Sequence, residues 1–491
     1  MVCRSFDEMI RTSYDEFKEI PGIYEKINGG YIPRTFGEFY TDVRSLAEKL
    51  LDMGLKHKNV MLYGKNSYNW MVVYMAVVAY VGVIVPVDKT WKEKDISHIL
   101  SDTQIDCIFY SDSLKDNLAN IDVLKANLEN ETSDLISKGQ GLDTKRREFE
   151  ENPERICSIM FTSGTTSVPK KIALSEKNLT ANGSELEKLI CISAADRYML
   201  SLPLSHIAPV LASFIYPMSM GASLYIPEDF KEMAEDLKLI RPTVFYGVPK
   251  IFEEIWKAIP AEKKKKIKKG IKISNFLRRF GIDIRRKIFA EFHRSLGGAV
   301  RFAYSGAAKI DDWLVNVYND MGLLILQAYG MTESSAIISF DSINDYRLCS
   351  VGKALPNQIL KIIEKDADGI GEICVKGDNI AVCAVAEDGY LHTGDLGYMD
   401  KDGYLFIAGR KKRLIKFSDG KNVYPDELEE LLLQFQEIKQ VRIYEENGRI
   451  AAAIVSDCNP AIINELVENL NGTLPHYKRI RKIKFVSIIH H

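Results

Sequence analysis

The chain has 491 residues, 46% of them hydrophobic and 27% charged, and this ordinary globular composition excludes global disorder. Its 65 basic and 67 acidic residues leave a formal net charge of −2, so the chain as a whole gives no support to nucleic-acid binding. Eight scattered cysteines without a C-x-x-C pair exclude a zinc ribbon or a disulfide framework, and with an N-terminus that lacks a signal-peptide pattern they predict a cytoplasmic protein.

Helical and strand patterns alternate from about residue 35 to residue 111. Apolar residues recur at helical spacing over 36–54, and strand-like runs follow at 59–63 and 105–110. Such alternation indicates a parallel sheet covered by helices. Residues 112–153 are charged and weakly apolar, which is typical of surface helix and linker.

One apolar segment tests whether the chain spans a membrane. From Trp70 to Val87 there are eighteen residues without a charge, which reaches the lower limit for a membrane span. The alternative is a buried helix capped by Asn66 or Ser67 and ending near Gly82, followed by a buried strand at 83–87. We favour this alternative, because it accounts for both the glycine and the proline of the segment.

A second α/β run extends from residue 156 to about 340, and short strands with Gly-rich turns follow it. We therefore predict an α/β fold whose large N-terminal domain, residues 1–409, holds two α/β subdomains at about 1–155 and 156–340. A small sheet or β-barrel-like subdomain would occupy residues 341–409. A small, mobile α+β C-terminal domain would follow at 410–491.

A buried-strand pattern at 156–161 leads into a loop rich in hydroxyl groups: Thr162, Ser163, Gly164, Thr165, Thr166, Ser167, Val168, Pro169 and Lys170. Backbone N–H groups in such a loop can form an anion-binding nest, and Lys170 adds a positive charge. The loop therefore predicts a cradle for the β- and γ-phosphates of a nucleotide, although its spacing does not fit a Walker A loop. A solvated Ser/Thr turn is the alternative.

Four later segments strengthen this prediction: Ala328-Tyr-Gly-Met-Thr-Glu-Ser334, Thr393-Gly-Asp395, Gly409-Arg-Lys-Lys-Arg-Leu-Ile-Lys416 and Gly420-Lys-Asn-Val-Tyr-Pro-Asp-Glu427. Taken in order with the loop, they resemble the motifs of the adenylate-forming superfamily. That superfamily includes acyl-CoA synthetases, peptide-synthetase adenylation domains and luciferases. The resemblance covers the chain from about residue 30 to its end.

The resemblance implies a role for each motif residue. Adenine would stack on Tyr329, and Asp395 would accept hydrogen bonds from the ribose hydroxyls beside Arg410. Glu333 would bind Mg²⁺, and Lys412 would mark a hinge before the C-terminal domain. The implied catalytic residues are Thr162, Lys170, Glu333 and Lys412. The other implied ATP-binding residues are Ser163, Gly164, Thr165, Thr166, Ser305, Gly306, Ala307, Ala328, Gly330, Met331, Thr332 and Ile407.

The implied chemistry is ATP-dependent formation of an acyl-adenylate, followed by transfer to a thiol. Residues 202–207 and 241–252 resemble the long-chain acyl-CoA synthetase branch, which implies a fatty acid and coenzyme A as substrates. In that branch His206 would lie near the reacting carboxylate, and Tyr246 with Gly247 would border the acyl tunnel. An aryl or amino acid substrate and an acyl carrier protein as acceptor are alternatives, and a structural role for His206 is another.

The chain departs from the family pattern at several points. Ser167 and Lys171 replace two glycines of the family loop, and the connection at 377–389 is short. Residues 474–486 resemble the segment that precedes the family's last motif, and the chain stops about where that motif should begin. We therefore expect a truncated C-terminal domain, whose end is either natural or the start of an expression tag. The catalytic lysine of that motif cannot be assigned to Lys478, Lys482 or Lys484. A nucleotide-binding pseudoenzyme or scaffold is therefore the rival function.

One stretch has no counterpart among these motifs. From Lys263 to Lys287 there are twelve basic residues and one acid, Asp283, with Ile267, Ile271, Phe276, Leu277 and Phe280 among them. Such a surface can rest on anionic lipid, which predicts peripheral contact with the inner membrane surface. A solvated helical face is the alternative.

Overall fold

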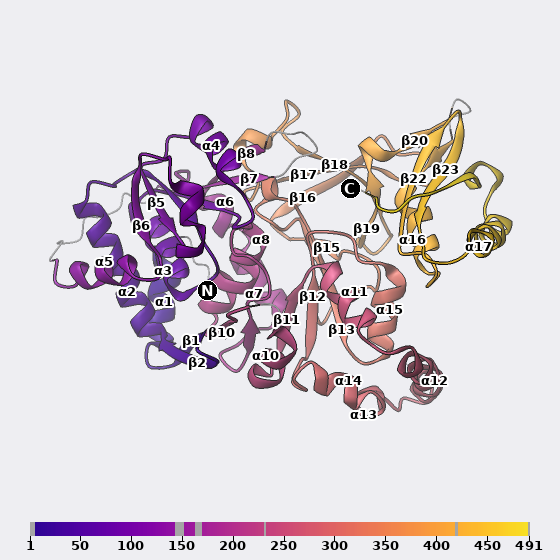
Figure 1. Cartoon of the computed structure of the whole chain (residues 1–491), viewed down its shortest axis with the longest axis horizontal. Coiled ribbons are helices and arrows are strands. Elements are labelled where there is room, and N and C mark those ends of the chain that lie inside the picture. The colour runs from indigo at the N-terminus through magenta and orange to yellow at the C-terminus, as the bar shows by residue number, and fades with distance from the viewer. Residues whose placement is uncertain (1–4, 143–151, 163–168, 230–231, 418–420, 490–491) are drawn as a thin grey trace.

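The computed structural model describes residues 5–142, 152–162, 169–229, 232–417 and 421–489. Two mixed sheets with their helices form the body of the molecule, and a four-stranded sheet connects this body to a small C-terminal unit (Figure 1). The fold class is therefore α/β with a large N-terminal and a small C-terminal part, as the sequence predicts.

The first sheet has the order β6-β5-β3-β4-β7-β8 and is parallel except for β8. Its side chains alternate between two cores, with Val60 and Leu62 facing one and Met61 and Tyr63 the other. The strands are β3 (Asn59–Tyr63), β4 (Val83–Val87), β5 (Cys107–Tyr110), β6 (Leu124–Asn127), β7 (Ile156–Thr162) and β8 (Lys170–Ser175). The helices of this layer are α2 (Phe36–Asp52), α3 (Tyr68–Ala76), α4 (Glu93–Asp102) and α5 (Glu131–Gly139).

The uncharged segment from Trp70 to Val87 lies inside this layer. Ser67 caps α3 by accepting a hydrogen bond from the Trp70 N–H, a π-helix follows at Val77–Val81, and β4 begins after Gly82. A Cβ on Gly82 would lie 2.3 Å from the Lys58 carbonyl oxygen, so only glycine allows this close approach. The structure confirms the predicted helix and strand. In the described part of the chain, no helix is both long and apolar enough to cross a bilayer.

The second sheet has nine strands in the order β15-β14-β13-β12-β11-β9-β10-β1-β2. They are β1 (Pro21–Ile27), β2 (Gly30–Thr35), β9 (Arg197–Met199), β10 (Ser223–Ile226), β11 (Val244–Gly247), β12 (Phe302–Ser305), β13 (Leu324–Tyr329), β14 (Ser339–Phe340) and β15 (Lys353–Ala354). The main helices that accompany it are α1 (Phe6–Phe17), α7 (Gly183–Ile190), α10 (Met233–Ile240), α11 (Pro249–Lys257), α12 (Ala261–Arg278), α14 (Ala290–Ser295) and α15 (Asp312–Asp320). Short helices are α6 (Glu176–Thr180), α8 (Ile207–Pro209), α9 (Tyr216–Ser219) and α13 (Arg285–Ile288).

The two sheets do not divide at residues 155 and 156, as the sequence led us to expect. The strands β7 and β8 complete the first sheet, since β7 pairs with β4. The hairpin of β1 and β2 joins the far edge of the second sheet, where β1 pairs with β10. Periodicity predicts which residues are buried but not which sheet they join. The assignment by chain order was therefore wrong for the pair β7 and β8 and for the pair β1 and β2.

The last part of the chain consists of smaller sheets. Residues expected to form a barrel-like subdomain give an open antiparallel sheet of β16 (Gln358–Ile363), β17 (Gly371–Gly377), β18 (Leu391–Met399) and β19 (Leu405–Arg410). The C-terminal unit has its own core and packs α16 (Pro425–Leu433) and α17 (Pro460–Thr473) on a three-stranded sheet. Its strands are β22 (Gln440–Glu446), β23 (Arg449–Val455) and β24 (Ile480–Phe485), beside a short pair, β20 (Ile415–Lys416) and β21 (Asn422–Val423).

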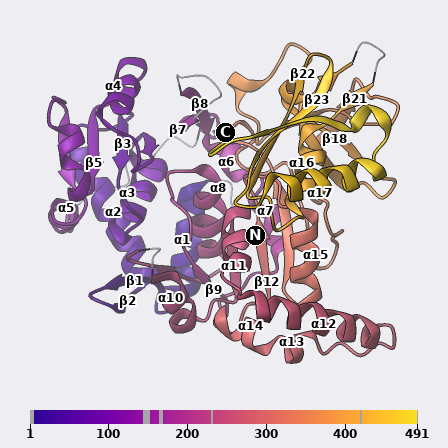
Figure 2. The ribbon, with the colours of Figure 1, turned by 45° about the vertical axis from the view of Figure 1, so that its right-hand side comes forward.

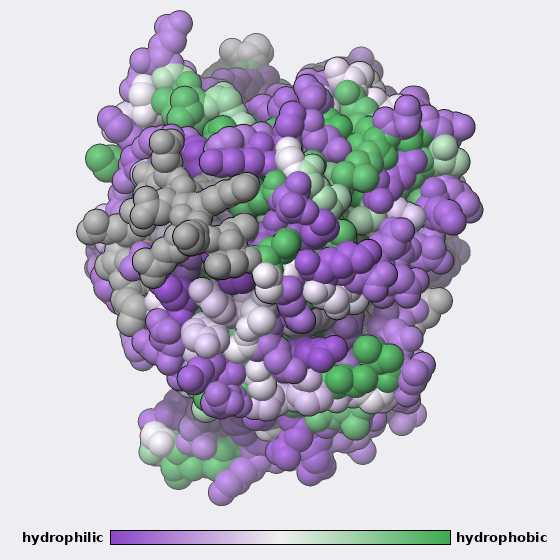
Figure 3. Space-filling view, turned by 90° about the vertical axis from the view of Figure 1, so that its left-hand side faces the viewer, coloured by the Kyte–Doolittle hydropathy of each residue, from purple (hydrophilic) through white to green (hydrophobic). Residues whose placement is uncertain are grey.

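The surface over the first sheet is mainly hydrophilic. Figure 3, which views the molecule from that end, shows hydrophobic residues in separate groups among hydrophilic ones. Scattered apolar residues of this kind are normal on an exposed protein face.

Candidate active site

Three residues from separate motifs meet at the edge of the second sheet. Tyr329 ends β13, Asp395 lies in β18, and Arg410 ends β19 directly opposite Asp395 in the strand pairing. The Tyr329 hydroxyl donates to Asp395 Oδ2 at 2.7 Å, and Arg410 Nε lies 2.9 Å from Asp395 Oδ1. Burial raises the pKa of Asp395, although Arg410 and the tyrosine hydroxyl act in the opposite direction. A buried carboxylate is thus held in place by two different donors.

These residues form part of the wall of a cavity of about 370 Å³ between the body and the C-terminal unit. The cavity is large enough for a nucleoside and is lined by side chains and backbone from both parts. Seven of the predicted nucleotide-binding residues line it: Ala307, Ala328, Tyr329, Gly330, Asp395, Ile407 and Arg410. Residues of the segments at 305–307, 328–334, 393–395 and 409–416 therefore meet at one cavity.

The turn after β12 supplies the next part of the wall. The Ser305 hydroxyl is buried and has no hydrogen-bond partner within the described residues. A Cβ on Gly306 would lie 3.3 Å from the Tyr246 hydroxyl, and Ala307 adopts a φ of 68°. Ala307 therefore lines the cavity, and two residues earlier the buried Ser305 hydroxyl lacks a partner among the described residues.

Residues after β13 turn sharply and bring Glu333 to Lys170 of β8. A Cβ on Gly330 would lie 2.1 Å from the Ala336 carbonyl oxygen, so only glycine fits this turn. Met331 and Thr332 follow, and Glu333 lies buried in a 3₁₀ turn at Thr332–Ser334. Glu333 is a hard oxygen ligand, although the described residues contain no group of three or more metal-binding side chains.

The predicted phosphate loop connects the antiparallel strands β7 and β8. Thr162 and Lys170 are paired across this hairpin, and Lys170 Nζ lies 2.9 Å from Glu333 Oε1. The contact brings the strand that follows the loop motif and the motif after β13 together. The predicted ligands Ser163, Gly164, Thr165 and Thr166 lie outside the described residues, as does Ser167. Lys171 points elsewhere and pairs with Asp102 at 3.3 Å.

The cavity is also lined by residues to which the sequence motifs assigned no role, although Asp426 lies within the motif at 420–427. Lys309, Asp311, Asp426, Glu429 and Glu430 line it, the last three from α16 of the C-terminal unit. Lys309 Nζ lies 2.6 Å from Glu430 Oε2, and the Asp312 N–H donates to Glu430 Oε1 at 2.8 Å. Burial and the nearby Glu430 raise the pKa of Asp311 to about 6. Acidic residues on a helix resemble an ordinary solvated face, so the sequence contained no signal for this wall.

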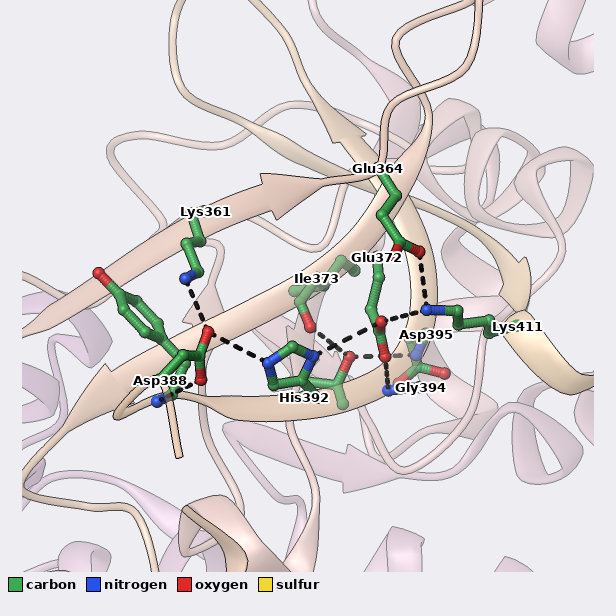
Figure 4. A network of polar contacts seen from close by, with 11 residues as sticks. Lys361, Glu364, Glu372, Ile373, Asp388, His392, Gly394, Asp395 and Lys411 are labelled. Carbon is green, nitrogen blue, oxygen red and sulfur yellow. Dashed lines mark hydrogen bonds and ion pairs between the residues drawn. The ribbon is translucent and has the colours of Figure 1, made fainter. Parts of the chain in front are cut away.

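A polar network surrounds the predicted hinge segment that follows Arg410 (Figure 4). Lys411 Nζ lies 2.6 Å from Glu372 Oε2 and 2.9 Å from Glu364 Oε2. Glu372 Oε1 also accepts a hydrogen bond from the Gly394 N–H, next to Asp395. Lys412, the predicted hinge residue, is exposed in the following 3₁₀ turn at Lys411–Arg413. The network therefore fixes Lys411 to the four-stranded sheet.

The predicted acid-binding residues lie on other elements. His206 precedes α8 and is exposed, with Nε2 3.3 Å from Asp88 Oδ2 at the end of β4. The hydrogen bond from His206 holds the pKa of Asp88 well below its usual range.

The predicted tunnel residues lie at the end of β11. Tyr246 is buried there, and burial raises its pKa to about 12. On the Cβ side of Gly247 the rings of Phe245 and Phe252 would lie 3.3 Å away, so this side of the glycine is filled. The acyl tunnel remains a prediction.

The three lysines that the sequence could not assign belong to the C-terminal unit. Lys478 Nζ lies 2.7 Å from Glu427 Oε2, and Lys482 Nζ lies 2.8 Å from Glu446 Oε2. Lys484 lies near the end of β24 and is exposed. Two of the three therefore have carboxylate partners within their own unit.

Comparison with known proteins identifies related chains. The model of the AMP-binding enzyme family matches residues 17–383. Long-chain-fatty-acid–CoA ligase ACSBG2 from Gallus gallus is 25% identical over 87% of this chain, which spans only 64% of that relative's length. Long-chain-fatty-acid–CoA ligase 1 from Cavia porcellus is 26% identical, with 92% of this chain and 74% of that protein covered. The anthranilate CoA ligase AuaEII, solved with anthranoyl-AMP, has the same fold, with a TM-score of 0.80, 19% identity and coverage of 99% and 94%.

Proposed function

Because the chain belongs to the AMP-binding enzyme family, we propose that it uses ATP to activate a medium- or long-chain fatty acid and transfers the acyl group to coenzyme A. The observation that carries this proposal is the Tyr329–Asp395–Arg410 cluster in the cavity wall, whose carboxylate is buried. The names of two relatives, both long-chain-fatty-acid–CoA ligases, support the choice of substrate.

In the first half-reaction, a carboxylate oxygen of the fatty acid attacks the α-phosphorus of ATP. The bond to the bridging oxygen breaks, and pyrophosphate leaves with both bonding electrons. Such transfers depend on positioning and charge neutralisation, so no protein nucleophile is required. Asp395 would hold the ribose hydroxyls and Arg410 would add a fixed positive charge beside them.

The phosphate end would be held by Thr162, Lys170 and Glu333. Lys170 supplies positive charge, and Glu333 would bind Mg²⁺, which neutralises charge on the phosphates. Because Lys170 already contacts Glu333, the arrival of ATP and Mg²⁺ would replace one ion pair with several charge-assisted contacts. The Ser305 hydroxyl would be available to the base.

In the second half-reaction, the thiolate sulfur of coenzyme A attacks the acyl carbonyl carbon. A new C–S bond forms, the bond between the carbonyl carbon and the phosphate oxygen breaks, and AMP leaves. We propose that the C-terminal unit turns about Lys412 between the two steps. Lys412 is exposed directly after Lys411, whose contacts with Glu372 and Glu364 fix the near side of that hinge.

Pyrophosphate exchange tests the first step. Purified protein would be offered ATP, Mg²⁺ and either octanoate, palmitate, oleate, benzoate or an amino acid. We expect exchange with the fatty acids, and Asp395→Ala should abolish it. Exchange with benzoate or an amino acid alone would contradict the substrate, and no exchange with any acid despite ATP binding would favour a pseudoenzyme or scaffold.

Thioester formation tests the second step. The acids that support exchange would be incubated with either coenzyme A or an acyl carrier protein, and the thioester would be measured by mass spectrometry. We expect product with coenzyme A. Product with the carrier protein alone would replace coenzyme A as the acceptor and leave the adenylation step unaffected.

A further inference from the structure

The helix α12 has two faces with different surroundings. On its inner face Gly270 and Ser274 are buried, and Ile267 and Ile271 pack against the core of the second layer. A Cβ on Gly270 would lie 3.0 Å from the Phe289 ring, so the glycine lets the helix approach closely. This close packing fixes which residues face outward.

The outer face is strongly basic. Lys265, Lys268, Lys269 and Lys272 recur at helical spacing and are all exposed. None of these four makes an ion pair with another described residue, whereas their neighbour Lys263 pairs with Glu291 at 2.6 Å. The four lysines therefore present unneutralised positive charge to the solvent.

The end of the same helix and the turn that follows it carry exposed apolar side chains. Phe276 and Phe280 are 57% and 68% exposed, and their rings contact each other with centroids 5.3 Å apart. Ile273 and Ile282 are 57% and 49% exposed beside them. A pair of aromatic rings directed into water next to a row of lysines is unfavourable unless another surface covers it.

The location of α12 leaves this surface accessible. Figure 1 and Figure 2 both place the helix at the outer edge of the second layer, on the far side of α15 from the four-stranded sheet. Residues 263–287 include only one acid, Asp283, and Arg285 Nη2 lies 2.7 Å from it. No described acidic side chain therefore neutralises the lysine row.

We propose that the outer face of α12, formed by these four lysines with Phe276 and Phe280, docks the protein onto an anionic lipid bilayer. The lysines match negatively charged headgroups, and the aromatic pair enters the boundary between headgroups and acyl chains. An acidic protein would match the charge but would leave the separate apolar tip unexplained. The proposal does not depend on the proposed enzymatic activity.

Co-sedimentation with vesicles tests the proposal with the full chain. The probes are phosphatidylcholine vesicles and vesicles of phosphatidylcholine with phosphatidylglycerol, at several salt concentrations. We expect binding to the anionic vesicles only, weakening as salt rises. Binding to neither vesicle, equal binding to both, or retention on duplex DNA without vesicle binding would overturn the proposal.

Two variants locate the surface. The fourfold variant Lys265→Glu, Lys268→Glu, Lys269→Glu and Lys272→Glu should lower the partition coefficient by about 100-fold or more. The double variant Phe276→Ser and Phe280→Ser should lower it about tenfold. Unchanged binding in either variant would overturn the proposed surface. Circular dichroism checks that each variant is folded.

A matched control distinguishes the effect of this surface from the effect of a change in net charge. Lys56, Lys94, Lys115 and Lys401 are exposed and lie on other parts of the molecule. Changing these four to glutamate alters the net charge equally, and we expect vesicle binding to fall far less than in the α12 variant. An equal loss would show that the protein's overall charge governs binding, which would overturn the proposal.

Discussion

At the ribose end of the proposed nucleotide site, Asp395 is buried and bonded to the Tyr329 hydroxyl and the Arg410 guanidinium. At the phosphate end, the Lys170 ammonium pairs with the buried Glu333 alone among the described residues. The side chains of Lys170 and Arg410 are both 58% exposed, so the two ends differ in the number of contacts and not in the exposure of the cation. Strand pairing positions the first group, because Asp395 and Arg410 face each other in neighbouring strands. A hairpin and a short 3₁₀ turn position the second.

The difference indicates that the two ends contribute to binding in different ways. A cluster that is already ordered loses little conformational entropy when a ligand binds, so its hydrogen bonds contribute almost fully to affinity. Lys170 has a single partner on a flexible side chain and must first be ordered, and the ligand's charge must compensate for that loss. We therefore expect the ribose end to supply affinity for the nucleoside and the phosphate end to distinguish ATP from AMP.

The largest effect should come from Asp395→Ala. It removes the shared acceptor and leaves the Tyr329 hydroxyl and Arg410 without it, so we expect AMP affinity to fall about 100-fold. Isothermal titration calorimetry measures this change. Asp388→Asn is the control, because Asp388 is exposed and contacts Lys361 and His392 but not Asp395. Unchanged AMP binding in Asp395→Ala would refute the assignment of the ribose end.

The second prediction concerns the pH dependence of the protein's stability, to which the buried Asp341 beside β13 contributes. Asp341 accepts hydrogen bonds from the N–H groups of Gln327 in β13 and of Arg347, and burial raises its pKa to about 7. A raised carboxyl pKa stabilises the fold at low pH, and this contribution is lost as pH rises toward 7. We expect a loss on the order of 2 kcal/mol between pH 5 and pH 7.

Thermal unfolding from pH 5 to pH 8 measures this dependence. Asp341→Asn should flatten it, because the amide does not ionise. The exposed Asp368→Asn is the control and should leave the slope unchanged. An identical slope in wild type and Asp341→Asn would show that Asp341 does not titrate in this range.

The third prediction concerns the phosphate end. Lys170→Met should weaken ATP binding about tenfold while leaving AMP affinity unchanged, since AMP lacks the β- and γ-phosphates. Calorimetry with both nucleotides gives the two affinities. Lys171→Met is the matched control, because this neighbour pairs with Asp102 instead of Glu333. Equal loss for AMP and ATP would abolish the proposed division between the two ends.

The smallest effect should come from a residue outside both ends. Thr35 forms a capping box with Glu38 at the start of α2, and Thr35→Ala should lower the free energy of unfolding by about 1 kcal/mol. Denaturant unfolding measures this loss, and both nucleotide affinities should stay as in wild type. Altered affinity would mean that stability and binding are coupled, which would complicate the interpretation of the other variants.

Much of the fold and site could be predicted from local patterns. Strands at 59–63, 83–87 and 223–226 appear at the expected bounds, because each is a short apolar run between turn residues. Asp395 and Arg410 face each other in the paired strands β18 and β19, and the end of β13 brings Tyr329 to them. A motif specifies its own backbone geometry, so its residues can be recognised without knowledge of the whole fold.

Other parts could not be predicted from the sequence. The wall formed by Lys309, Asp311 and Glu430 exists only because α16 packs across the cavity, and no periodicity encodes such a contact between units. The hairpin of β1 and β2 was missed because β2 is mostly exposed and contains Pro33, which resembles a loop. Long-range pairing determines both features.

The exchange of strands between the two large sheets has a consequence for how the chain folds. Ile23 of β1 pairs with Leu224 of β10. The hairpin of β1 and β2 therefore cannot join the second sheet until the segment that forms β10 has been synthesised. The first sheet likewise waits for β7 and β8. Contacts between such distant residues slow folding and prevent either sheet from forming alone. The body should therefore unfold as one cooperative unit, and fragments cut just before β7 should not fold independently.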